Sequence, residues 1–96
     1  SRTNFICYRP AGKLQRVLAE AYDRKYGVNN FSQATKAGKF IFKNLLAEKI
    51  LLRDFTEHQA LQGCLRQTVG LPEENGIVIS KIKGICRECL GNEQIN

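Results

Sequence analysis

The feature that most constrains this chain of 96 residues is a short β-rich segment that precedes a series of helical patterns. The segment runs from Thr3 to Tyr8, and Arg9-Pro10 closes it. Its β-branched and aromatic residues predict one strand of about six residues. Because we expect the rest of the chain to be helical, this strand has no partner in its own sequence. Unpaired backbone groups are costly, so we expect two copies of residues 3–8 to pair antiparallel across a two-fold axis.

Four segments after the strand have helical features. In residues 11–25, apolar side chains recur at positions 14, 17, 18, 21 and 22, and Gly27 ends the helix. Residues 31–52 predict a second helix, whose apolar arc is too wide for a single neighbouring helix to cover. Residues 56–70 and 71–90 predict a third and a fourth helix, each with a capping pattern at its start. Residues 77–82 could equally form a strand, because three β-branched residues follow Asn75-Gly76.

The positive charge is concentrated in the first half of the sequence. The chain has a formal net charge of +6. Residues 1–50 contain ten basic and three acidic side chains, whereas residues 51–96 contain five basic and six acidic ones. A basic balance favours an anionic partner such as nucleic acid, and we expect the first half to bind it.

Composition and motifs argue against several classes of protein. No apolar run approaches the roughly 18–20 residues of a membrane span, so we expect a cytoplasmic protein that does not contact a membrane. We find no Gly-rich phosphate loop, carboxylate pair or nucleophile with a base, and His58 is interpreted as a surface residue. We therefore predict no enzyme, no catalytic residue and no cofactor. The four cysteines are expected to be reduced, and we predict no metal site, because Cys86 and Cys89 are two ligands where zinc needs four. The alternative is that two copies of this pair meet across a dimer axis and form a site of four cysteines.

The order of strand, helix, glycine-containing turn and second helix resembles the ribbon-helix-helix family of DNA-binding proteins. The residues that match are Phe5-Ile6-Cys7-Tyr8-Arg9-Pro10 and Asn30-Phe31-Ser32-Gln33-Ala34-Thr35-Lys36. The resemblance covers about residues 2–50. It implies a mainly α fold with one short β-strand, in which a dimer forms an intermolecular antiparallel β-ribbon. Residues 1–52 would then be the DNA-binding and dimerisation region, and residues 53–96 a helical extension for oligomerisation or partner binding.

The resemblance also implies which residues contact DNA. The ribbon of this family lies in the major groove, and alternate side chains on its outer face contact base edges. If Phe5 and Cys7 point into the dimer core, the candidate base contacts are Arg2, Asn4, Ile6 and Tyr8. The family also holds a phosphate at the start of its second helix. The candidate phosphate contacts are therefore Phe31, Ser32, Gln33 and Lys36, and Lys36, Lys39 and Lys43 form a basic stripe.

These observations predict a homodimer, or a higher oligomer, that binds specific double-stranded DNA sequences. Its role would be that of a transcriptional repressor or of a plasmid or phage nucleoprotein accessory factor, with residues 55–90 as the candidate surface for a protein partner. One alternative is a helix-turn-helix or winged-helix protein, in which residues 31–50 contact DNA and residues 77–82 form a wing strand. The other alternative is a helical protein-interaction module that does not bind DNA.

Overall fold

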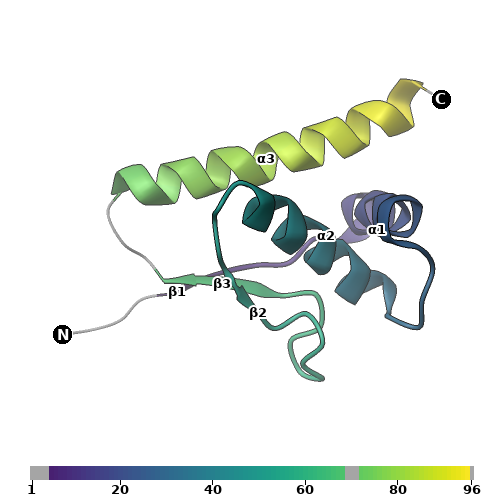
Figure 1. Cartoon of the computed structure of the whole chain (residues 1–96), viewed down its shortest axis with the longest axis horizontal. Coiled ribbons are helices and arrows are strands. Elements are labelled where there is room, and N and C mark those ends of the chain that lie inside the picture. The colour runs from purple at the N-terminus through teal and green to yellow at the C-terminus, as the bar shows by residue number, and fades with distance from the viewer. Residues whose placement is uncertain (1–4, 69–71, 96) are drawn as a thin grey trace.

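The computed structural model describes residues 5–68 and 72–95, and these residues form three helices and three short strands. The elements in chain order are β1 (Phe5–Tyr8), α1 (Gly12–Tyr26), α2 (Gln33–Ala47), β2 (Arg53–Asp54), β3 (Leu65–Thr68) and α3 (Pro72–Ile95). The helices lie on one side of the sheet, and α3 extends along the molecule over α2 (Figure 1). The prediction of a mainly helical chain is confirmed, but the described part contains three strands where the sequence predicted one.

The three strands form one antiparallel sheet in the order β1–β3–β2. Phe5 of β1 lies opposite Thr68 of β3, and Tyr8 lies opposite Leu65. The first strand is therefore confirmed over residues 5–8, while residues 3 and 4 lie outside the described residues, but the inference that it lacks a partner in its own chain is wrong. The sheet also joins the two regions that the sequence divided at residue 52, because β1 and β3 come from opposite sides of that boundary.

The helix predicted over residues 56–70 is wrong for the residues that the structure describes. Residues 55–64 form turns, and β3 follows them. Gly63 has φ 80°, a left-handed conformation that suits glycine and does not continue a right-handed helix. After it the side chains alternate, since Leu65 and Gln67 are buried whereas Arg66 and Thr68 are not. This period of two is typical of a half-buried strand.

The first two helices confirm the expected elements and correct their limits. α1 ends at Tyr26, close to the predicted end, and Gly27 caps it with φ 91°. α2 begins after Ser32, whose hydroxyl accepts a hydrogen bond from the backbone N–H of Thr35 at 3.1 Å. It ends at Ala47, five residues before the predicted residue 52, because the chain turns there and Lys49 adopts φ 65°. This early end frees the next residues to enter the sheet as β2.

Residues 77–82, which could form a helix or a strand on the sequence alone, are helical. These residues lie inside α3, so the wing strand of the winged-helix alternative is wrong. Pro72 occupies the first turn, and Glu73 and Glu74 lie near the positive end of the helix dipole. None of the helices in the described ranges is long and apolar enough to cross a membrane.

The core lies between the helices and the inner face of the sheet. Its most completely buried side chains are Val17, Leu18, Ile41, Leu45, Thr56 and Leu65. α1, α2 and β3 all contribute to this set, so the two halves of the sequence share one core. The opposite face of the sheet is not covered by the helices (Figure 1).

Candidate anion-binding site

The strand β1 presents the opposite face from the one predicted for base contacts. Arg2 and Asn4 lie outside the described residues. Ile6 and Tyr8 are half-buried on the side of the helices, whereas Phe5 and Cys7 are exposed. Tyr8 donates a hydrogen bond from Oη to Oε1 of the buried Gln67 at 2.6 Å, and burial raises the pKa of Tyr8. The predicted orientation is therefore reversed, because the register of β1 on β3 places Ile6 and Tyr8 beside the buried positions of β3.

The predicted phosphate contacts at the start of α2 have hydrogen-bond partners within the chain. The backbone N–H of Phe31 donates to Oδ1 of Asn29 at 2.9 Å. The hydroxyl of Ser32 is occupied by the helix cap described above. The amide of Gln33 donates to a glutamine side chain of α1 at 2.9 Å. These contacts organise the loop between α1 and α2.

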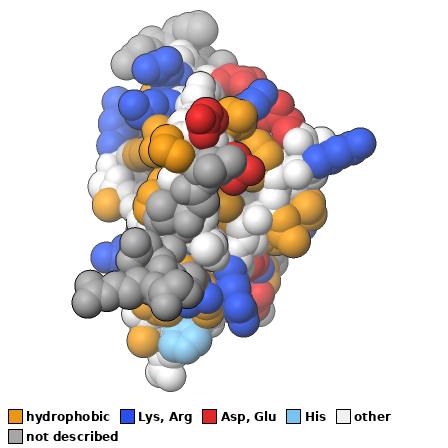
Figure 2. All heavy atoms as spheres, turned by 90° about the vertical axis from the view of Figure 1, so that its left-hand side faces the viewer, with side chains coloured by type: hydrophobic (Ala, Val, Ile, Leu, Met, Phe, Trp, Pro, Cys, Tyr) orange, Lys and Arg blue, Asp and Glu red, His pale blue; other side chains and the backbone are white. Residues whose placement is uncertain are grey.

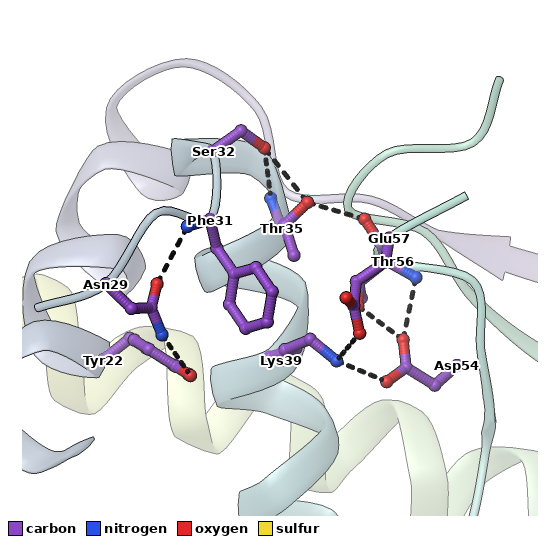
Figure 3. A network of polar contacts seen from close by, with 9 residues as sticks. All are labelled: Tyr22, Asn29, Phe31, Ser32, Thr35, Lys39, Asp54, Thr56 and Glu57. Atoms are coloured by element: carbon purple, nitrogen blue, oxygen red, sulfur yellow. Dashed lines mark hydrogen bonds and ion pairs between the residues drawn. The ribbon is translucent and has the colours of Figure 1, made fainter. Parts of the chain in front are cut away.

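The lysines predicted to face DNA are paired with carboxylates. Nζ of Lys36 lies 2.7 Å from Oδ1 of Asp23, and the lysine side chain is only 10% exposed. Nζ of Lys39 lies 3.1 Å from Oδ2 of Asp54 and 2.9 Å from Oε2 of Glu57 (Figure 3). Much of the positive charge of the predicted basic stripe is therefore compensated inside the molecule.

The surface also shows positive and negative charges near one another. On the face shown in Figure 2, basic, acidic and apolar side chains are interspersed. Among the described side chains visible on that face, basic and acidic groups lie close to one another. A large polyanion such as duplex DNA is bound through many basic contacts, whereas a small anion needs only a few.

Two arginines lie side by side on the open face of the sheet. Arg53 of β2 is paired in register with Arg66 of β3. Their neighbours Asp54 and Leu65 are also paired and face the helices, because side chains alternate along a strand. Arg53 is exposed and Arg66 is half-buried. Within residues 5–68 and 72–95, neither guanidinium forms an ion pair with a carboxylate.

Aromatic rings hold the two guanidinium groups in place. Cζ of Arg66 lies 4.0 Å from the ring centroid of Phe5 and 5.0 Å from that of Phe55. Cζ of Arg53 lies 5.8 Å from the centroid of Phe55. Such cation–π contacts orient a guanidinium but leave its charge uncompensated and its N–H donors available in the plane of the group. Two neighbouring positive charges repel each other, and an anion bound to both would remove this repulsion.

A groove of about 570 Å³ lies on the side of β2 and β3 that faces α2 and α3, and Arg53 and Arg66 are among its lining residues. Its walls include apolar side chains, among them Phe42, Leu52 and Val78. Two carboxylates, those of Asp54 and Glu74, also line the groove, but no ion pair joins either of them to Arg53 or Arg66 in the described part of the chain. The volume lies within the range of small-molecule sites.

The two guanidinium groups are the feature of this groove that suits an anion. Arginine forms two parallel hydrogen bonds to a carboxylate or a phosphate, and a pair of arginines suits a doubly charged phosphate. The described lining residues include no lysine, histidine or cysteine. The described lining residues therefore offer hydrogen-bond donors and positive charge, and we assign no covalent chemistry to them.

The Asp54 carboxylate fixes the strand that carries Arg53. Its Oδ1 accepts hydrogen bonds from the backbone N–H of Thr56 at 2.7 Å and from the Thr56 hydroxyl at 2.6 Å (Figure 3). Burial alone would raise the pKa of Asp54, but the hydrogen bonds from Thr56 and Lys39 outweigh it and lower that pKa. Burial alone would lower the pKa of Lys39, but its hydrogen bonds to Glu57 and Asp54 raise it. The ion pair therefore stays charged over a wide range of pH.

The two neighbouring cysteines lie in α3, away from the arginine groove. Cys86 is half-buried and Cys89 is buried, and burial raises the pKa of both thiols. All four cysteines are free thiols. Among the residues that the structure describes, no group of three or more potential ligands could hold a metal ion.

Arg53, Arg66 and Phe55 are not among the candidate residues predicted from the sequence. The cause is the helix predicted over residues 56–70, because this prediction places Arg66 in a helix and not in a strand. The sequence gives no clear signal for this strand, because Leu65 is followed by three polar residues, Arg66, Gln67 and Thr68, and only their burial in the structure alternates. The partner strand β2 is only two residues long and has no periodic pattern either.

Comparison with known proteins gives short partial matches to one enzyme. The chain is 44% identical over 48 residues to histidinol-phosphate aminotransferase of Escherichia coli O1:K1, of Escherichia coli O6:K15:H31 and of Shigella boydii serotype 18. Each match includes 50% of this chain but covers only 14% of the relative's length. No protein-family model matches the chain. No solved structure matches it either.

Proposed function

We propose that this chain binds the anionic group of a substrate through Arg53 and Arg66, and that it does so as part of an aminotransferase. The observation that carries the proposal is the pair of arginines, which are held by aromatic rings and lack carboxylate partners among the described residues. Proteins normally pair charges that they bury or crowd together. A site in which that pairing is left open is suited to a charged ligand.

The partial similarity to histidinol-phosphate aminotransferase supports the same proposal. The substrate named for those enzymes carries a phosphate group, and paired arginines are well suited to bind a phosphate. We therefore propose a phosphate monoester as the ligand of the arginine groove. We assign only the binding of this group to the described residues, and no step of amino transfer.

Calorimetric titration of the 96-residue chain with inorganic phosphate and with methyl phosphate tests the proposal. We expect Arg53→Met and Arg66→Met each to weaken binding at least about tenfold, because each removes charge-assisted hydrogen bonds. Arg66→Lys should recover only part of the affinity, since lysine lacks the planar fork. Arg87→Met, on the exposed surface of α3, is the matched control and should leave binding unchanged. The proposal fails if the Arg53→Met/Arg66→Met double variant binds phosphate as the unmodified chain does.

A second candidate is the duplex DNA binding predicted from the sequence. It is favoured by the excess of basic residues in positions 1–50 and by the position of β1 at an edge of the sheet, where a second copy could pair in an antiparallel ribbon. The protein would then act as a repressor or as a nucleoprotein accessory factor.

Gel-shift titration at low salt distinguishes the two candidates. DNA binding through β1 predicts that Asn4→Ala changes the preference between sequences and that Ile6→Pro abolishes both the dimer and the complex. Arg53→Met/Arg66→Met would leave such a complex largely intact. The absence of a shifted duplex at low salt would contradict this second candidate.

A further inference from the structure

We infer that Phe55 is the positioning residue of the arginine pair, an inference that rests on the proposed anion site. Of the two rings near these arginines, Phe5 contacts only Arg66, whereas Phe55 contacts both guanidinium groups. Phe55 therefore sets the place of each guanidinium relative to the other. This relative placement decides whether one anion can contact both arginines at once.

Hydrogen bonds of the backbone hold Phe55 in place independently of its contacts with the arginines. Its N–H donates to the carbonyl of Cys64 at 3.0 Å, which continues the alignment of β2 with β3 into the turn. Its own carbonyl accepts the N–H of His58 at 2.9 Å. Phe55 is thus held at the exact point where the chain leaves the sheet.

The two neighbours of Phe55 anchor it to α2. Asp54 is paired with Lys39, and the carbonyl of Thr56 accepts a hydrogen bond from the hydroxyl of Thr35 at 2.7 Å (Figure 3). Thr56 is completely buried. Both contacts attach the chain on either side of Phe55 to the same helix, so the backbone that carries the ring is held in place.

The ring itself is held from the side as well. The imidazole of His58 lies edge-on to it, with ring centroids 6.3 Å apart and an interplanar angle of 78°. An arginine side chain loses much rotational freedom when it binds a ligand, and a side chain that is already oriented loses less. Phe55 accordingly increases the affinity of the site for an anion without touching the anion.

The test replaces the aromatic ring of Phe55 with a smaller aliphatic side chain, which stays apolar. In Phe55→Leu we expect the Kd for inorganic phosphate to rise about three- to tenfold, from the loss of two cation–π contacts. Phe55→Tyr keeps an aromatic face and should restore the affinity. Phe31→Leu is the matched control, because Phe31 is also half-buried and also lies against a cation, Lys39 at 5.3 Å, but does not contact the arginine pair. Urea unfolding of each variant identifies the fraction that is folded.

A second measurement examines the positions of the arginines without any ligand. Protons that lie over an aromatic face are shielded, so the Nε–H resonances of Arg53 and Arg66 should move downfield in Phe55→Leu and stay in place in Phe55→Tyr and Phe31→Leu. Unchanged resonances in Phe55→Leu would overturn the inference, as would an equal loss of phosphate affinity in Phe31→Leu. If Arg53→Met and Arg66→Met leave phosphate binding unchanged, the proposed function fails as well. If these two variants weaken binding but Phe55→Leu does not, only the role of Phe55 is wrong.

Discussion

At the scale of single residues, side chains that look alike in the sequence differ in what surrounds them. Lys36 and Lys39 appear as exposed cations in a helical stripe, yet both are paired with carboxylates. Arg53 and Arg66 lie in the part of the sequence that is nearly neutral, yet they are the arginines that contact aromatic rings without a carboxylate partner in the described residues. The location of basic residues along the chain is therefore a poor guide to the free positive charge.

The Asp54 network predicts a particular dependence of stability on pH. The lowered pKa of Asp54 contributes stability above its ordinary value of 3.8, and this contribution is lost as the pH falls through the lowered pKa. The raised pKa of Lys39 contributes stability below its ordinary value of 10.5, which is lost as the pH rises through the raised pKa. We expect Asp54→Asn to cost roughly 1–2 kcal/mol at neutral pH and to flatten the acid limb of the curve.

Urea unfolding between acid and neutral pH measures this effect. Glu57→Gln is the matched control, because the Glu57 side chain is 60% exposed and surface ion pairs contribute about 0–1 kcal/mol. The acid limb of this control should follow that of the unmodified chain. Parallel acid limbs for Asp54→Asn and the unmodified chain would show that Asp54 does not stabilise the fold through its charge.

At the scale of elements, α2 packs closely against the turn before β3. This contact fixes the position of β2 and β3, the strands that carry Arg53 and Arg66, relative to the helix. A Cβ added at Gly38 would lie 2.5 Å from the carbonyl oxygen of Gly63 and 2.6 Å from Cγ2 of Thr56. A Cβ added at Gly63 would in turn lie 2.6 Å from the carbonyl oxygen of Ala34. The two glycines allow the helix and the turn to pack with their backbones in contact.

This contact predicts that Gly38→Ala destabilises the protein by about 1–3 kcal/mol, although alanine is the better helix former. The matched control is Gly84→Ala in α3, where an added Cβ meets nothing within 4 Å. That change should stabilise the protein by up to about 1 kcal/mol. Thermal unfolding of both variants gives the comparison, and stabilisation by Gly38→Ala would contradict the packing described for α2.

The elements differ in how well the sequence predicts them. α1, α2 and α3 have apolar residues at helical spacing or capping residues at their starts, and these local signals were enough to predict the three helices from the sequence. β2 and β3 depend on pairing between residues that are distant in sequence, such as Arg53 with Arg66, and local patterns do not record such pairs. Thr56 and Gln59 have the spacing of a capping box, and that local signal indicated a helix where the chain forms turns.

At the scale of the whole molecule, all three strands of the sheet come from one chain. β3 lies between β1 and β2, so the strand that the sequence analysis left unpaired obtains its partner from residues 65–68. The helices cover one face of this sheet and leave the arginine face open (Figure 1). The candidate site could not be predicted from the sequence, because its two arginines are 13 positions apart in the sequence and come together only when β2 pairs with β3.

Pairing within one chain predicts that folding does not require a second copy. The thermal unfolding midpoint should be the same over a hundredfold range of protein concentration, since only linked association makes it depend on concentration. Sedimentation at the same concentrations provides the control for association of the folded protein. A midpoint that rises with concentration would indicate an obligate dimer and would favour the ribbon of the second candidate.

The most direct test of the arginine site is a titration of the ¹⁵N-labelled chain with inorganic phosphate, followed through the arginine Nε–H resonances. We predict that Arg53 and Arg66 shift together along one saturating curve, while Arg24 and Arg87 do not shift. Equal small shifts of all four arginines, without saturation, would show only general ionic screening. That result would contradict the claim that Arg53 and Arg66 form a binding site for an anionic group.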